Sequence, residues 1–415
     1  MKNLFYSFTL LISLSLFSQT NYKTQVFNPQ IKTLQIGVMG EKMGLPIIEL
    51  NGSNTLQIRF DEMSHESHSY GYRVLHCNAD WTLSNLNTNE YLNGYTSGII
   101  TDYTRSLNTT FLYTHYQFNL PNDDMNFKVS GNYLLEIYED NLVEKPLVRA
   151  CFSIVEPKVN ITANVRGNTD TELNGRFQQI DFEVGLNGFS VRDAASEVKV
   201  VVRQNNRTDN QVTNLKPTFL SSSKLSYINN KALIFEGGNE YHRFDISSVY
   251  AAGEGVDKIR YNRTSYDANL SENKIQTSKT YMQEPDVNGK YIINMQNAQD
   301  DNIEADYMYV NFKLAAKQPF FDGQIYLGGE FNYNLLNDAV GMKYDMNEQS
   351  YIQKVLLKQG GYNYQYWFLP KGERAASTER VDGSYWQTRN EYTIYVYHRG
   401  WGERYDKLVG VKGLE

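Results

Sequence analysis

A histidine and a cysteine stand side by side in the segment SYGYRVLHCNADW, which is where a reactive centre would be sought first. A cysteine with a histidine is the chemistry of thiol hydrolases, because the imidazole can take the proton from the thiol. The preceding residues alternate as in a β-strand, however, and neighbouring side chains on a strand point to opposite faces, so His76 and Cys77 cannot pair directly. We interpret the segment as a core strand whose end is pinned in a hydrogen-bonded turn by Asn78, Asp80 and Trp81.

The segment HESH has the residue types of a metal site. It places His65 and His68 beside Glu66, with Asp61 nearby. The spacing differs from H-E-x-x-H, which puts two imidazoles on one face of a helix, and the segment lies in a predicted hairpin loop. We therefore expect a solvated loop tip and no metal here.

A second segment, DDNIEAD, offers alternating side-chain oxygens as a calcium-binding loop would. These oxygens belong to Asp300, Asn302, Glu304 and Asp306. Ala305 takes the position of the turn glycine of such a loop, and Asn311 takes that of the bidentate acid. The segment is better interpreted as an acidic interdomain linker.

No other motif indicates catalysis. The sequence has no G-x-S-x-G elbow, no phosphate-binding glycine loop and no dinucleotide fingerprint. Carboxylate pairs such as Asp61 with Glu62 and Asp123 with Asp124 fall in turn-like segments, where they cap the backbone and add solubility. We predict a protein that is not an enzyme and uses no cofactor.

The N-terminal segment MKNLFYSFTLLISLSLFS has a basic start at Lys2, an apolar stretch and a polar change at Gln19. These features are typical of a secretory signal peptide, which we predict over residues 1–18 with cleavage between Ser18 and Gln19. No later stretch reaches the roughly 20 apolar residues of a membrane helix. With a formal net charge of −7, we expect an exported, soluble chain with no membrane span and no nucleic-acid partner.

Export would place the two cysteines, Cys77 and Cys151, in an oxidising compartment. Both lie in apolar, strand-like runs. Two states stay open for this pair, which are one disulfide or two buried free thiols.

Most of the remaining sequence reads as short strands. TLQIRF, GNYLLEIYED, QQIDFEVGL, EVKVVVRQ and ADYMYVNFKLAA alternate or are apolar throughout, and turn residues separate them. The chain is long enough for several domains. We predict an all-β protein of tandem immunoglobulin-like β-sandwich domains, divided into an N-terminal domain at 19–157, a middle β-domain with long polar loops at 158–301 and a C-terminal domain at 302–415.

The C-terminal domain resembles the carbohydrate-binding immunoglobulin-like modules found beside glycan-degrading enzymes. Those modules have a Gly-Asp-Phe-Asn type turn and a later Gly-Tyr-x-Tyr-x-Phe strand, matched here by Gly329, Glu330, Phe331 and Asn332 and by Gly361, Tyr362, Tyr364 and Tyr366. Tyr333 stands near the place of their sugar-stacking tryptophan. Exposed rings at Tyr333, Tyr364 or Trp367 would favour a glycan-binding protein, and buried rings would indicate scaffold.

The N-terminal domain resembles the first domain of the plug protein family of the type IX secretion system. The resemblance is carried in order by HCNADW, EYLNGY, YTHYQFNLPND and SGNYLLEIYED, and GGYNYQYWF and ERYDKLVG are similar to that family's C-terminal part. It implies a non-enzymatic periplasmic β-protein, associated with the outer membrane through the translocon. Its partner would be the large outer-membrane β-barrel translocon, whose periplasmic opening it would seal when no substrate is passing. The sequence does not identify the residues that bind this partner.

Overall fold

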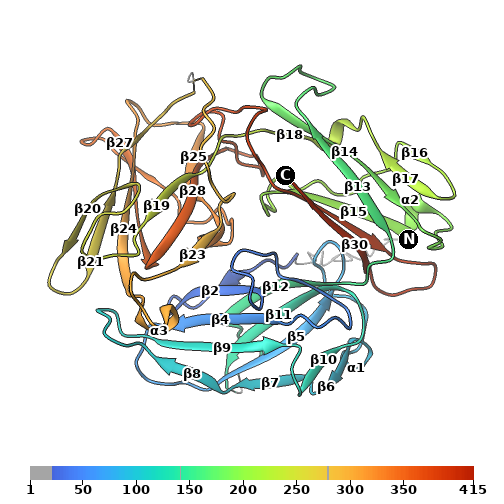
Figure 1. Cartoon of the computed structure of the whole chain (residues 1–415), viewed down its shortest axis with the longest axis horizontal. Helices are drawn as coiled ribbons and strands as arrows, with labels where there is room; N and C mark the ends of the chain where they lie inside the picture. The colour runs from blue at the N-terminus through green and yellow to red at the C-terminus, as the bar shows by residue number, and fades with distance from the viewer. Residues whose placement is uncertain (1–20, 141, 278–279) are drawn as a thin grey trace, which may run out of the picture.

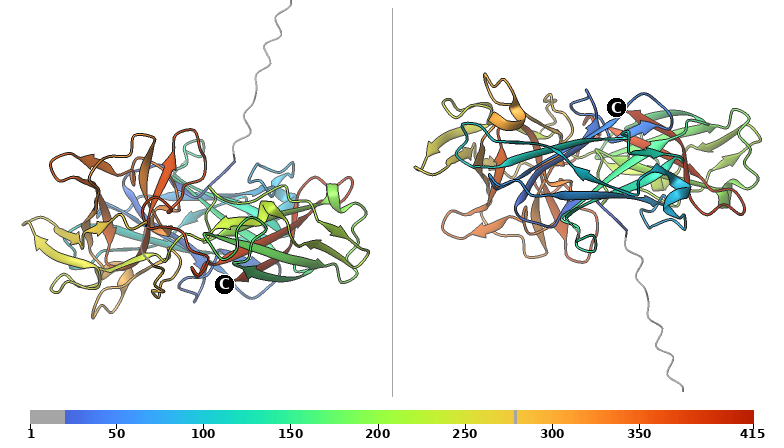
Figure 2. Two further views of the ribbon diagram at one scale, coloured as in Figure 1. Left: turned by 90° about the horizontal axis from the view of Figure 1, so that it is seen from above. Right: turned by 90° about the horizontal axis from the view of Figure 1, so that it is seen from below.

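The computed structural model describes residues 21–140, 142–277 and 280–415, and nearly all regular structure in them is β-strand. The strands form three β-units: a first unit (residues 22–156), a second unit (157–237 with 386–415) and a third unit (238–385). In Figure 1 the first unit lies at the bottom, the second at the upper right and the third at the upper left. Figure 2 shows the molecule turned by 90°, with the units arranged in one flat layer. The all-β prediction is confirmed.

The first unit has two main sheets. One sheet has the order β1-β12-β11-β5-β7, with β3 parallel to β12, and the other has the order β2-β4-β9-β8. A two-stranded ribbon of β10 and β6 and the short helix α1 complete it. The bounds are β1 (Gln25–Val26), β2 (Ile31–Val38), β3 (Ile47–Glu49), β4 (Leu56–Glu62), β5 (Tyr70–Cys77), α1 (Thr88–Tyr91), β6 (Leu92–Gly94), β7 (Ser97–Ile100), β8 (Asp102–Arg105), β9 (Thr114–Leu120), β10 (Met125–Phe127), β11 (Gly131–Glu139) and β12 (Val148–Val155).

Alternation along the strands builds the core between these sheets. Leu56, Ile58 and Phe60 of β4 point inward at every second position and are fully buried. They share the core with Tyr133 and Leu135 of β11. The other face of β11 is buried as well, because the second unit covers part of it.

The second unit is assembled from two separate parts of the sequence. One sheet has the order β13-β14-β17-β16, with β18 beside β14, and the other has the order β15-β29-β30. The bounds are β13 (Asn160–Arg166), β14 (Phe177–Gly185), α2 (Ala194–Glu197), β15 (Val198–Gln204), β16 (Phe219–Leu220), β17 (Lys224–Tyr227), η1 (Lys231–Leu233), β18 (Ile234–Glu236), β29 (Tyr392–His398) and β30 (Lys407–Leu414).

The third unit is inserted between β18 and β29. The strand β28 pairs with β19, β23 and β25, and a second sheet has the order β20-β21-β24-β27-β26, with β22 beside β24. The bounds are β19 (His242–Asp245), β20 (Val256–Tyr261), β21 (Tyr266–Leu270), β22 (Asn273–Lys274), β23 (Tyr291–Ile293), α3 (Asp301–Glu304), β24 (Tyr307–Ala315), β25 (Gly323–Gly328), η2 (Glu330–Asn332), β26 (Lys343–Asp345), β27 (Ser350–Lys358) and β28 (Gly360–Pro370).

The strands do not follow the predicted division between 158–301 and 302–415. Val198 of β15 pairs with His398 of β29, so the C-terminal strands complete a sheet of the middle stretch. Conversely, His242 of β19 pairs with Tyr364 of β28. Alternating patterns identify strands but not their pairing partners. A division of the sequence into consecutive domains therefore separates strands that pair in the same sheet. The immunoglobulin-like topology of each unit stays a prediction.

Candidate functional site where the three units meet

The turn that follows β5 is present as predicted. Asn78 N donates to Thr82 O over 2.8 Å, and Trp81 N donates to Asn78 O over 2.9 Å. The Asp80 carboxylate accepts from Thr82 N and Thr82 Oγ1 at 3.0 and 2.7 Å. Asp80 is therefore used within the turn and makes no pair with His76 or Cys77.

The same turn docks against the C-terminal hairpin of the second unit. Asp406, which is buried, accepts hydrogen bonds from Ala79 N at 2.9 Å, Lys199 Nζ at 3.0 Å and Arg399 Nε at 2.9 Å. Next to it, Tyr397 Oη donates to Asn132 Oδ1 over 2.9 Å. The HCNADW motif and the C-terminal ERYDKLVG segment are thus two halves of one polar interface.

His76 lies beside this interface and is buried. Its Nε2 is 3.2 Å from Ser130 O, and its ring packs edge-on against Tyr133 and Tyr405. Gly131 makes this approach feasible, since a Cβ there would lie 2.4 Å from His76 Nε2. Burial lowers the pKa of His76 to about 4, so the ring is neutral in the folded chain near neutral pH.

We expect His76 to make stability depend on pH. Below about 6.5, the ordinary histidine pKa, the unfolded chain takes up this proton, whereas the folded chain does so only near pH 4. The unfolded state binds more protons in this window, so the free energy of unfolding rises with pH, by roughly 3 kcal/mol from pH 4 to 6.5.

The measurement is urea unfolding at pH 4 to 7 for wild type, His76→Phe and His65→Phe. Carboxylates contribute a slope of the same sign, so the slope difference between variants is the quantity that tests His76. We expect a flatter slope in H76F than in wild type, and H65F is the control for the same substitution in a loop. Parallel slopes for all three proteins would refute the role of His76.

The two cysteines form no disulfide, and both are free thiols. The strand β11 lies between them, since Asn132 pairs with Cys77 and Leu134 pairs with Cys151. Two strand spacings amount to about 10 Å, beyond the roughly 7 Å that a disulfide can bridge between Cα atoms. Burial raises the pKa of both thiols, so neither is an activated nucleophile.

A buried ion pair joins the first and third units. Lys358 Nζ lies 2.6 Å from Asp61 Oδ2, and both side chains are almost completely buried. Asp61 also accepts from Tyr307 Oη at 2.7 Å and contacts His115 Nδ1 at 2.6 Å, and the Lys358 ammonium lies 4.2 Å from the centre of the Tyr113 ring.

The pKa values of this pair reflect both burial and pairing. Burial alone would raise the pKa of Asp61, but the Lys358 ammonium and the His115 contact outweigh it and hold that pKa below its usual value. Burial lowers the pKa of Lys358. Asp61, which was predicted as a turn cap, is therefore a core element of an interface between units.

The side chains of the HESH and DDNIEAD segments, which have the residue types of metal ligands, contact other parts of the protein. His65 Nε2 lies 3.1 Å from Ser106 O, whereas His68 Nδ1 lies 2.7 Å from Glu62 Oε1, so the two rings have different partners. Asp300 caps α3, and Asp306 accepts from the backbone of residues 110 and 111 in the first unit. Within the described residues, no three His, Cys, Asp or Glu side chains gather as metal ligands would.

Two of the three aromatic side chains considered as a sugar platform are buried, and the third, Tyr333, is half-buried. Tyr364 is 3% exposed and Trp367 is fully buried, so neither can stack on a glycan. Tyr333 packs against the core of the first unit, and burial raises the pKa of its hydroxyl, which bonds the backbone of Leu34. The turn that resembled a sugar-binding loop instead fixes the third unit to the first.

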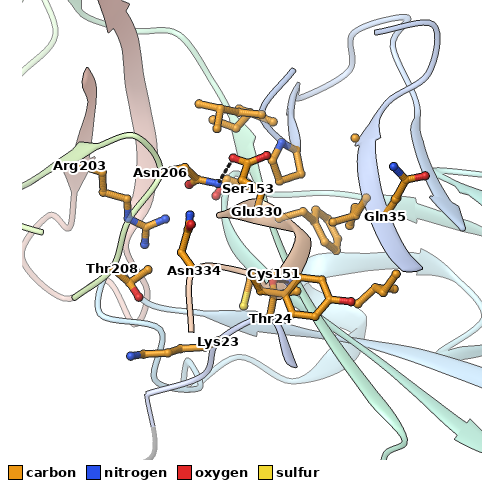
Figure 3. Close-up of a pocket in the computed structure, with 18 of the residues that line it drawn as sticks. Lys23, Thr24, Gln35, Cys151, Ser153, Arg203, Asn206, Thr208, Glu330 and Asn334 are labelled. Atoms are coloured by element: carbon orange, nitrogen blue, oxygen red, sulfur yellow. Dashed lines mark hydrogen bonds between the residues drawn. The ribbon is translucent and has the colours of Figure 1, made fainter. Parts of the chain in front are cut away.

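A central cavity of about 420 Å³ lies between these interfaces (Figure 3). All three units contribute to its wall: Lys23, Thr24 and Cys151 from the first, Arg203, Asn206 and Thr208 from the second, Glu330 and Asn334 from the third. Asn206 Nδ2 donates to Glu330 Oε1 over 3.2 Å. Burial raises the pKa of Glu330.

Sequence reasoning missed Lys358, Asp406 and Arg203. Each is an ionisable residue in or beside an apolar strand, which is a signal of a buried polar contact. The partners of Lys358 and Asp406, however, lie more than a hundred residues away in the sequence.

The predicted cleavage site at Ser18 and Gln19 lies outside the described residues.

Comparisons with known proteins bear on the first unit and on the whole chain. Residues 31–156 match the family described as type 9 secretion system plug protein, 1st domain. A crystal structure of a hypothetical protein from Parabacteroides merdae ATCC 43184 is similar over 95% of this chain and 100% of that chain, with 41% identity and a TM-score of 0.94. No curated protein matches the sequence. In the described part of the chain, no helix is both long and apolar enough to cross a membrane.

Proposed function

The chain belongs to the family of type IX secretion system plug proteins, and from this premise we propose that it is a periplasmic stopper for the secretion translocon. It would seat against the periplasmic opening of the system's large outer-membrane β-barrel and close it between substrates. The observation that carries the proposal is the family match over residues 31–156. The whole-chain similarity to a solved protein extends the same architecture to the other two units.

Direct contacts among the three units support this role. A stopper must keep its shape against an opening, and flexibly linked domains would leave gaps. Here the first unit is fixed to the second through Asp406 and to the third through the Asp61–Lys358 pair and Tyr333. The flat, three-cornered body in Figures 1 and 2 offers a broad face rather than a narrow rod.

The chemistry of the site supports a binding role over a catalytic one. The suspected reactive residues His76 and Cys77 are buried and serve the first unit's strand and interface. Several loops between strands are exposed, among them residues 39–42 and 262–264, and exposed loops are where a releasable contact with a partner would form. We propose that the chain carries out no reaction.

The test is affinity purification of the tagged chain from mildly solubilised cell envelopes, with identification of the co-purifying proteins by mass spectrometry. We expect a very large outer-membrane β-barrel to be recovered. Deleting the protein should also let a polar dye that is too large for general porins enter the periplasm.

An unrelated periplasmic protein with the same tag is the control for non-specific recovery. Circular dichroism of the purified chain shows whether the tag has disturbed its folding. A folded chain that recovers no outer-membrane protein, in cells whose dye entry is unchanged by the deletion, would refute the stopper role.

A further inference from the structure

The wall of the central cavity carries a surplus of positive charge, although the whole chain has a formal net charge of −7. Its cationic side chains are Lys23, Lys42, Arg59, Arg203, Lys290 and Arg374, and its acidic ones are Glu41, Asp80 and Glu330. Among the described residues, Lys290 is the one cation of this set that forms an ion pair, with Glu391 at 2.6 Å. The other five cations form no ion pair with a carboxylate of the described residues.

Arg203 is the best placed of these cations. Its Nε donates to Gln211 Oε1 over 3.0 Å. Its Cζ lies 5.9 Å from the centre of the Trp81 ring and 5.4 Å from the centre of the Tyr395 ring. These contacts fix the planar group, and Figure 3 shows it pointing into the cavity toward Asn334. A fixed guanidinium with free N–H groups matches the two oxygens of a carboxylate.

Asn334 is a second, independent indication of a ligand. It is 5% exposed, yet its Oδ1 has no hydrogen-bond partner in the described chain, and its Nδ2 reaches Asn205 O only at 3.5 Å. Buried amides normally bond at both ends. The Nδ2 group carries two N–H donors and Asn205 O takes one of them, so the second can be donated to an anion in the cavity.

We propose that the central cavity is a binding site for a carboxylate group, held chiefly by Arg203 and also by Lys23, Thr208 and Asn334. Thr208 and Lys23 flank the same space in Figure 3. The carboxylate comes either from a small free dicarboxylic acid or from an acidic segment of a partner protein. Because three units line the site, the bound group bridges all of them and stabilises their arrangement.

The inference goes beyond the proposed function and does not depend on it. Isothermal titration calorimetry at low salt tests it, using the full chain without residues 1–18. The probes are succinate, citrate, the peptide acetyl-Asp-Glu-Asp-amide and its acetyl-Asn-Gln-Asn-amide counterpart.

We expect saturable binding of at least one carboxylate probe and none of the amide peptide. Binding of succinate or citrate would identify a small free acid as the source, and binding of the acidic peptide alone would identify a partner segment. Arg203→Gln should weaken the affinity at least about tenfold, the loss expected for a charge-assisted hydrogen bond. Arg105→Gln, which removes an exposed arginine of β8 far from the cavity, should leave the affinity unchanged.

Arg203→Gln also removes contacts with Trp81 and Tyr395, so a second variant separates binding from folding. Asn334→Asp keeps the side-chain size at a position with φ +54°, which Asn and Asp tolerate better than most residues. Its added negative charge should weaken binding at least as strongly. No saturable heat with any probe, or R203Q and N334D that bind like wild type, would overturn the proposal. Recovery of the barrel in the affinity purification would be unaffected by either outcome.

Discussion

Replacing Lys358 with methionine should destabilise the protein by about 3–5 kcal/mol, because it leaves a buried carboxylate without its main counter-charge. Asp61 would keep its contacts with His115 and Tyr307 but lose the ammonium at 2.6 Å. Lys358 also donates to Asn302 O over 2.6 Å, so the variant loses a second link between strand β27 and the neighbouring segment. The measurement is the urea midpoint, followed by circular dichroism at pH 7.

Lys354→Met is the matched control, since it makes the same substitution on the same strand. Lys354 pairs with Asp267 at 2.5 Å, but its side chain is 49% exposed, and such surface pairs contribute about 0–1 kcal/mol. The double variant Asp61→Asn with Lys358→Met should recover part of the loss, because no uncompensated charge remains buried. If K358M costs no more than K354M, the pair does not hold the first and third units together.

The sequence predicted the local structure where local patterns determine it. The alternation in TLQIRF and YGYRVLHC corresponds to β4 and β5, and the Asn78–Thr82 turn forms through the Asn and Asp side chains that favour such turns. Neighbouring side chains on a strand face opposite ways, which argues against a reactive His76–Cys77 pair. The structure agrees, with His76 near Ser130 and Cys77 in a cluster with Trp81 and Leu134.

The arrangement of the units could not be predicted in this way. Strand β15 pairs with β29 across nearly two hundred residues that contain the third unit. Such pairings depend on the register and the burial of the complete chain, which a local pattern does not encode. Asp61 and Lys358 likewise acquire their roles only when the first and third units meet.

The aromatic side chains of β28 show that a local sequence pattern is also insufficient to predict function. Tyr362, Tyr364 and Tyr366 at alternate positions indicated a strand correctly, but the pattern does not tell whether their rings face solvent or another sheet. One face of β28 lies in the core of the third unit. On the other face, Trp367 packs under the Arg207 guanidinium of the second unit at 4.2 Å.

Asp406→Asn should destabilise the protein by roughly 2–3 kcal/mol, the range for hydrogen bonds that involve a charged group. The new amide NH₂ would face donors, since Asp406 accepts from Ala79 N, Lys199 Nζ and Arg399 Nε. The loss should be smaller than for Lys358, because the side chains of Lys199 and Arg399 are 44% and 31% exposed and water can serve them. The measurement combines urea unfolding with limited proteolysis, in which the first unit should become separable at lower urea concentration.

Asp322→Asn is the matched control, because Asp322 pairs with Arg380 at the surface with 65% of its side chain exposed, where an ion pair contributes little to stability. The comparison also tests whether Asp406 holds the HCNADW and ERYDKLVG segments in contact. If Asp406 is the link, the first unit loosens from the second in D406N while both keep their β-structure. If D406N is no less stable than D322N, apolar contacts hold this interface without the Asp406 carboxylate; they are made by Ala79, Val201, Tyr395 and Leu408. The hydrogen bonds of Asp406 would then set the orientation of the turn and would not contribute to the stability of the interface.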